Sequence, residues 1–175
     1  MDPIDQIIAK EISHLSLDCK TGCDWCCQQL VVLTYRADAE AIIDRCQQQM
    51  TDEEFAAFKQ TVFTQAEAIN HMPYEQAETR QWPCPLLKDH QCTVYDIRPV
   101  ACHSVVSSDS NCCKAMLRAH SFDKLSKRHQ QLATEIGDRA MRLQIEVNDQ
   151  RPIDGAFELR TLLAEILQQR SEQAI

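Results

Sequence analysis

The stretch from Cys19 to Cys27, which reads Cys-Lys-Thr-Gly-Cys-Asp-Trp-Cys-Cys, places four thiols within nine residues and constrains the chain more than any other feature. A zinc or iron site needs anionic sulfur donors that converge on one point, and a short turn between two cysteines lets one piece of backbone supply both. Cys23 and Cys26 have this C-x2-C spacing, and Gly22 can adopt the positive φ that a tight turn often requires. The stretch therefore predicts metal binding.

Cys26 and Cys27 are adjacent, which adds a geometric constraint. Neighbouring side chains point in different directions, so they seldom bind one tetrahedral ion together. We therefore expect Cys27 to face a second metal or to bridge two metals.

A second cysteine region begins near Cys84, where the prolines on either side exclude regular helix. Residues 88–91 are a polar turn that leads back to Cys92, so we expect these two cysteines on the two arms of a hairpin-like excursion. A short helical turn that begins near Arg98 or Pro99 should then present Cys102.

Composition favours helix, because three glycines and six prolines are few for a β-rich protein and Ala, Leu, Gln and Glu are abundant. A length of 175 residues fits one domain. We expect a mainly α protein with a single domain over 1–175, irregular cysteine-rich loops and at most a short strand or hairpin.

Apolar periodicity places the expected helices. The run from Gln28 to Tyr35 is β-branched and predicts a short strand. Thr51 and Glu54 have the spacing of a capping box. The expected helices cover residues 3–16, about 36–49, about 52–70 and, as a pair interrupted near Pro152 and Gly155, about 121–170. Further expected caps are Asp2 and Ser121.

Charge limits the partners. The net charge of -8 and the pI near 5.2 argue against a nucleic-acid binder, which normally presents a basic face to phosphates, and against an anionic membrane surface. No apolar run approaches the length of a membrane span.

The ten cysteines also bear on the compartment. The N-terminal residues are acidic and amphipathic, unlike a secretory leader, so we expect a cytoplasmic protein with reduced thiols. Clustered cysteines then indicate metal more than disulfides. An oxidised, disulfide-rich domain is the alternative.

The order of these elements resembles a known family. Cys19-x3-Cys23-x2-Cys26-Cys27 is followed by Cys84-Pro85-Leu86-Leu87, by Cys92-Thr93-Val94-Tyr95-Asp96-Ile97-Arg98-Pro99-Val100-Ala101-Cys102, and by Ser107-Ser108-Asp109 ahead of Cys113. This pattern closely resembles the YkgJ-like cysteine-cluster proteins, which carry a zinc- or iron-chelating CxxCxxCC domain that is also seen in a flagellin lysine N-methylase. The similarity covers the motif core, 19–113, and implies that the helices on either side are packing elements.

The resemblance implies eight metal ligands, which could form two four-cysteine sites or one cluster with extra thiols: Cys19, Cys23, Cys26, Cys27, Cys84, Cys92, Cys102 and Cys113. Cys112 is an extra neighbour of Cys113, and the two could exchange roles. The family commonly has an arginine after Cys102, where this chain has His103. This histidine is a candidate metal ligand or hydrogen-bond donor to a cluster sulfur, as well as a structural residue.

Cys46 lies on an expected helix among apolar residues, which indicates a buried core residue.

Zinc and a four-iron cluster both accept four thiolates. The C-x3-C-x2-C spacing of Cys19, Cys23 and Cys26 is the one that radical S-adenosylmethionine enzymes use for a four-iron cluster, so the spacing slightly favours an iron–sulfur cluster over zinc. The large barrel of those enzymes does not fit a small helical chain.

Two functions remain open. The first is an iron–sulfur or zinc protein that serves electron transfer, metal handling or cluster-dependent modification together with a protein or redox partner. The second is a zinc-stapled protein-interaction module without catalysis. A modification enzyme like the lysine methylase is a third possibility, although the sequence has no evident separate substrate domain. Whether the chain is an enzyme stays open.

Overall fold

The computed structural model describes residues 3–28, 31–73, 76–77, 80–119, 122–150 and 157–173. Helices dominate these residues, and the strands are two residues each, so the expected mainly α class is confirmed. The described α-helices are α1 (Pro3–Ile12), α2 (Arg36–Gln49), α3 (Asp52–Asn70), α5 (Val100–Ser104), α6 (Ser110–Ala119), α7 (Lys127–Gln150) and α8 (Leu159–Gln173). None of them is both long enough and apolar enough to cross a membrane.

Two short antiparallel ribbons connect the helices. Strand β1 (Leu33–Thr34) pairs with β4 (Phe157–Glu158), and β2 (Leu87–Lys88) pairs with β3 (Gln91–Cys92). The β1–β4 ribbon joins segments far apart in the sequence, whereas β2 and β3 form the expected local hairpin. Single turns of 3-10 helix lie at η1 (Trp25–Gln28), η2 (Tyr95–Ile97) and η3 (Phe122–Lys124).

Helices α2 and α3 begin and end where the periodicity predicts. The capping box at the start of α3 is present, because Glu54 N donates to Thr51 Oγ1 over 3.2 Å and Thr51 N donates to Glu54 Oε2 over 3.0 Å. Each bond satisfies a backbone or side-chain group that the first helical turn leaves free.

Two other boundaries differ from the prediction. Helix α1 ends at Ile12 rather than at residue 16, and the Ser13 hydroxyl donates to the Lys10 carbonyl, a local bond that competes with further helix. Helix α7 begins at Lys127 rather than near 121, with His129 N donating to Ser126 Oγ. The predicted caps at Asp2 and Ser121 and the break at Pro152 and Gly155 lie outside the described residues.

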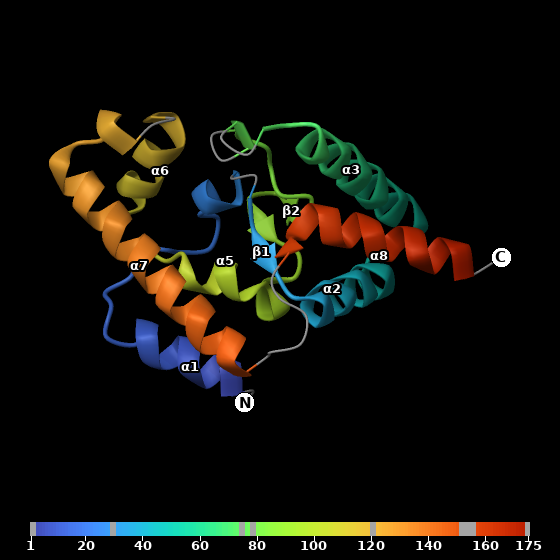
Figure 1. Cartoon of the computed structure of the whole chain (residues 1–175), viewed down its shortest axis with the longest axis horizontal. Helices are drawn as coiled ribbons and strands as arrows, with labels where there is room; N and C mark the ends of the chain where they lie inside the picture. The colour runs from blue at the N-terminus through green and yellow to red at the C-terminus, as the bar shows by residue number, and fades with distance from the viewer. Residues whose placement is uncertain are drawn as a thin grey trace.

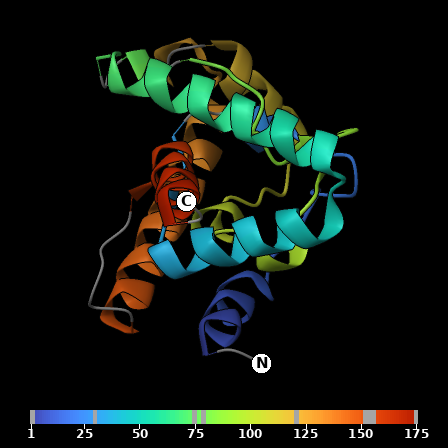
Figure 2. The ribbon, with the colours of Figure 1, turned by 90° about the vertical axis from the view of Figure 1, so that its right-hand side faces the viewer.

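Two helical layers surround the cysteine-bearing segments. In one layer α8 lies between α2 and α3, where Ile42, Val62 and Leu163 are fully buried (Figures 1 and 2). In the other layer α7 packs along α1 and α5, with Leu143 and Val147 buried against Ile8 and Tyr35 (Figure 1). The hairpin and η1 lie between the layers, so both cores position the cysteines.

Candidate metal centre

Main-chain hydrogen bonds bring the separate cysteine segments together. Cys84 N donates to the Cys27 carbonyl over 2.8 Å, and Trp82 N donates to the Gln28 carbonyl over 3.0 Å. On the other side, Asp18 N donates to the Ser107 carbonyl over 2.9 Å. The first cysteine loop is thereby held between the second cysteine region and the segment before α6.

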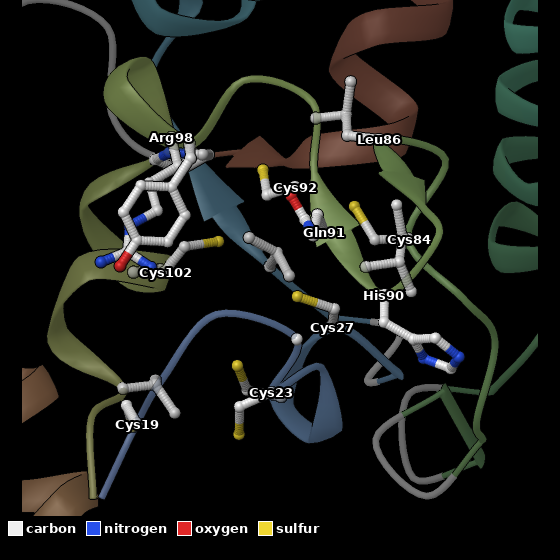
Figure 3. Close-up of a pocket in the computed structure, with 18 of the residues that line it drawn as sticks. Cys19, Cys23, Cys27, Cys84, Leu86, His90, Gln91, Cys92, Arg98 and Cys102 are labelled. Atoms are coloured by element: carbon white, nitrogen blue, oxygen red, sulfur yellow. The ribbon is translucent and has the colours of Figure 1, made fainter. Parts of the chain in front are cut away.

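Seven of the eight predicted ligands line one cavity of about 510 Å³ (Figure 3). They are Cys19, Cys23, Cys26, Cys27, Cys84, Cys92 and Cys102. Within the described part of the chain, no three His, Cys, Asp or Glu side chains converge closely enough to hold a metal ion. The thiols therefore surround the cavity without meeting at one point.

Four cysteines form what we call the inner set: Cys27, Cys84, Cys92 and Cys102. Figure 3 shows their sulfur atoms pointing into the same part of the cavity, from η1, the loop before β2, strand β3 and helix α5. Burial raises the pKa of Cys84, Cys92 and Cys102, and the charges of neighbouring cysteines raise it further. A bound cation would relieve this repulsion between thiolates.

The remaining candidates form the outer set: Cys19, Cys23, Cys26 and Cys113. Ser107 lies beside two of them, because its amide donates to Cys19 Sγ over 3.3 Å and its side chain acts to lower the pKa of Cys113. Burial raises the pKa of Cys113 to about 11, and the charges of Cys19 and Cys26 also raise it. Cys19 is exposed, so the outer set is more open to solvent than the inner set.

Cys26 and Cys27 are the junction between the two sets. A hydrogen bond from the Cys27 thiol lowers the pKa of Cys26 to about 7, and the same bond, with burial, raises the pKa of Cys27. The charges of Cys84 and Cys102 raise the pKa of Cys27, and the charge of Cys26 raises the pKa of cysteines in both sets: Cys92 and Cys102 in the inner set, and Cys23 and Cys113 in the outer set. Cys26 and Cys27 thus lie where the two sets meet, and the assignment of the two neighbours to different metals stays a prediction.

Two cysteines, Cys46 and Cys112, are buried away from the cavity. The Cys112 thiol is fully buried and donates to the His129 carbonyl on α7 over 3.6 Å, away from the cavity lining. Cys46 is 1% exposed in the core of α2, α3 and α8, as its apolar neighbours suggest. His103 lies on α5 with a half-buried side chain and is not part of the cavity wall.

Arg98 supplies positive charge at the cavity wall. Its guanidinium carbon lies 4.1 Å from the centroid of the Tyr95 ring, and its charge lowers the pKa of Cys26, after the larger effects of the Cys27 hydrogen bond and burial. The Nε of Arg98 is buried, and no described residue accepts a hydrogen bond from it. A buried donor without a partner is costly, so an anionic sulfur in the cavity would satisfy it. The donor set and this arginine fit a thiolate-bound metal.

The hairpin places His90 at the cavity, a position that sequence reasoning missed because His90 has no metal-ligand spacing. Both turn residues have positive φ, 49° at Asp89 and 62° at His90, as a type I′ turn requires. His90 Nδ1 lies 2.9 Å from Asp24 Oδ2, and Gln28 Nε2 donates to the same oxygen. The only sequence signal was the polar turn 88–91 between two cysteines.

Helix α6 was also missed. Its first residue, Ser110, donates both its amide and its hydroxyl to Asp18 Oδ2, over 2.9 and 2.6 Å. This cap comes from the residue just before the first cysteine, so the fold of α6 and the position of Cys113 depend on a contact between distant parts of the sequence. Lys114 extends the contact by lying 5.2 Å from the centroid of the Trp25 ring.

Comparison with known proteins agrees with the cysteine pattern. No curated protein and no solved structure matches the chain. The sequence profile of CxxCxxCC, a family of proposed zinc- or iron-chelating domains, matches residues 18–111. The match spans more than half of the chain, begins just before Cys19 and ends just before Cys113. The chain belongs to the CxxCxxCC family.

Proposed function

We propose that the protein binds metal through eight cysteines arranged as two four-thiolate centres, one on the inner set and one on the outer set. The observation that carries this proposal is that seven of the eight cysteines line one cavity, and that the sulfur atoms of the inner set point into the same part of it (Figure 3). Four thiolates are a complete ligand set for zinc or for a four-iron cluster. The family supports metal chelation without choosing the metal.

An iron–sulfur cluster is the favoured occupant of the inner set. The four thiols line a cavity and do not converge on one point, which suits a group of several iron and sulfide atoms better than a single ion. A cluster bound there would supply one-electron transfer, at a potential set by burial and by hydrogen bonds to sulfur. The chain would contribute the burial of Cys84 and Cys102 and the free donor of Arg98.

This function requires a redox partner protein and a compartment that keeps thiols reduced, so we place the protein in the cytoplasm. The acidic surface implied by a net charge of -8 would favour a partner with a basic docking face.

Zinc is the second candidate, favoured by the burial of the inner thiols. Closed four-thiolate zinc sites stabilise folds without turnover. Because the inner set draws on η1, the loop before β2, β3 and α5, zinc there would fix the two helical layers relative to each other. The protein would then present a rigid surface to a protein partner.

Anaerobic purification tests these alternatives. Iron, zinc and acid-labile sulfide are measured on one sample together with its absorption spectrum. Iron with matching sulfide and a broad visible band supports the cluster. Stoichiometric zinc in a colourless sample supports the structural module. A sample that contains neither metal, with all cysteines free to react with a thiol reagent, contradicts metal binding.

A further inference from the structure

Arg139 is a buried cation on α7 that donates hydrogen bonds to main-chain carbonyls. Its Nε donates to the Ser104 carbonyl over 3.3 Å, and its Nη2 donates to the Val106 carbonyl. The residue is 8% exposed, and burial of a guanidinium is costly unless its donors find acceptors. It lies outside residues 18–111, so the family match assigns it no role. Its contacts therefore need an explanation within this chain.

Both carbonyls belong to the segment that leads from α5 to α6. Ser104, Val106 and Ser107 are buried, and residues 105–107 form neither helix nor strand. A buried segment of this kind has carbonyls that no helix or sheet satisfies, so another donor must reach them. The bond to Ser104 is an ordinary cap at the C-terminal end of a helix. The bond to Val106 is different, because Val106 lies beyond the end of α5.

The peptide group between Val106 and Ser107 connects Arg139 to a cysteine. The C=O and the N–H of a trans peptide lie in one plane and point in opposite directions. Here the C=O accepts from Arg139, and the N–H donates to Cys19 Sγ over 3.3 Å. The Ser107 carbonyl also accepts from Asp18 N over 2.9 Å. A chain of hydrogen bonds therefore leads from α7 to a sulfur of the outer set.

Cys19 is the predicted ligand that most needs such support. It is exposed, whereas the other seven are half-buried, and it lies on a segment without helix or strand. Packing therefore does little to hold its sulfur in place. The main chain of Ser107 contacts this segment twice, through its N–H and its carbonyl, so the position of Ser107 sets the position of Cys19.

We propose that Arg139 is a positioning residue for the outer metal centre, which fixes the Val106–Ser107 peptide so that its N–H donates to the metal-bound sulfur of Cys19. This inference rests on the proposed metal binding. A metal-bound thiolate stays anionic, and hydrogen bonds to its sulfur orient and tune it as a ligand. The positive charge of Arg139 at the carbonyl strengthens the N–H of the same peptide as a donor, because linked hydrogen bonds polarise one another.

The test measures how fast N-ethylmaleimide labels individual cysteines of the full chain loaded with Zn²⁺. Trypsin cleaves after Lys10 and Lys20, so Cys19 lies on a peptide that contains no other cysteine and is resolved by mass spectrometry. In Arg139→Met the labelling rate of Cys19 should rise about tenfold or more, because losing a partner beyond the ligands usually weakens metal binding by about ten- to a hundredfold. The rate for Cys84 should stay unchanged, because these hydrogen bonds lead to the outer set.

Two further variants calibrate the result. Arg139→Lys keeps the positive charge and a donor for the Val106 carbonyl, so labelling of Cys19 should stay within a few-fold of the unsubstituted protein. Arg142→Met is the matched control. Arg142 lies three residues further along α7, has an exposed side chain and lies 3.9 Å from Glu11, so its loss should leave Cys19 labelling unchanged.

Amide hydrogen exchange provides a measurement that needs no substitution and so does not depend on whether Arg139→Met folds. In the unsubstituted chain loaded with Zn²⁺, NMR should show slow exchange of the Ser107 N–H, because this proton is held by the Cys19 sulfur. Exchange at the rate of a free amide would overturn the proposal.

The other outcomes are distinct. Unchanged Cys19 labelling in Arg139→Met would overturn the proposal. Faster labelling of Cys19 and Cys84 by the same factor, together with a lower free energy of unfolding in urea, would assign Arg139 a structural role and overturn it as well. An unsubstituted chain that is folded but takes up no Zn²⁺ would instead overturn the proposed function, and the role of Arg139 with it.

Discussion

The amide of Cys84 and the carbonyl of Cys27 form a hydrogen bond of 2.8 Å across 57 residues of sequence. The bond involves main-chain atoms alone, so it leaves both thiols available as ligands. Together with the bond between Trp82 N and Gln28 O, it forms one wall of the cavity from two segments. The protein can therefore hold its inner cysteines near one another before metal arrives, which lowers the ordering cost of binding.

Cys46 in the core and Cys102 at the cavity should respond differently to substitution. Cys102→Ser should abolish the inner metal centre, because serine cannot replace a thiolate ligand. Cys46→Ala should leave the metal content unchanged and lower the free energy of unfolding by about 1 kcal/mol through the small void it creates in the core. Elemental analysis and urea unfolding of both variants make the comparison. Metal loss in Cys46→Ala would contradict the assignment of Cys46 to the core.

The neighbours Cys112 and Cys113 provide a second paired comparison. The Cys112 thiol bonds to the His129 carbonyl, whereas Cys113 lies with Ser107 and the outer set. Cys113→Ser should reduce the metal bound per chain, and Cys112→Ser should keep the metal and lower stability. The reverse result would exchange the roles of the two residues and require α6 to be rotated from its described orientation.

Stability of the metal-free protein should fall in alkaline solution. The pKa of Cys46 is raised to about 11 from 9.0, chiefly by burial, so the unfolded chain loses this proton first. Below pH 9 the thiol is protonated in both the folded and the unfolded protein. Between about pH 9 and about pH 11 only the unfolded protein loses the proton, so rising pH progressively lowers the free energy of unfolding. The stability advantage of the unsubstituted protein over Cys46→Ala should therefore shrink across this range.

Urea unfolding at about pH 8 and about pH 10.5, with reductant and chelator present, measures that difference on either side of the onset of thiol ionisation. Subtracting the variant cancels the contribution of the lysines, the tyrosines and the other thiols. A stability difference that stays constant or grows between the two pH values would contradict the raised pKa of Cys46 in the folded protein.

The hairpin turn should tolerate glycine well. His90 has a φ of 62°, which costs an L-residue about 1–2 kcal/mol. His90→Gly would create the Asp-Gly pair preferred in type I′ turns, so it should raise stability by up to about 1 kcal/mol despite the loss of the exposed contact with Asp24. Thermal unfolding checks this, with Zn²⁺ titration alongside. Weaker Zn²⁺ binding in this variant would show that His90 takes part in the metal site.

The local part of the fold was predictable. Helices α2 and α3 follow from apolar periodicity, and the capping box of Thr51 and Glu54 fixes the start of α3. By contrast, α6 depends on Asp18, which lies 92 residues before the serine that it caps. Pairing of β1 with β4 depends equally on a distant contact. No local pattern encodes such contacts.

The candidate site also has a part that local sequence predicts and a part that depends on distant contacts. Spacing identified the cysteines that line the cavity, whereas the expectation that Cys27 faces a second metal or bridges two metals stays a prediction. The membership of the inner and outer sets depends on which elements meet, so it follows only from the fold.

Native mass spectrometry of anaerobically purified protein tests the central claim most directly, because it counts the metal atoms held by each chain. The unsubstituted chain should carry two centres, Cys84→Ser should retain only the outer one, and Cys23→Ser should retain only the inner one. A metal-free chain, or a single centre that both substitutions remove, would contradict two four-thiolate sites.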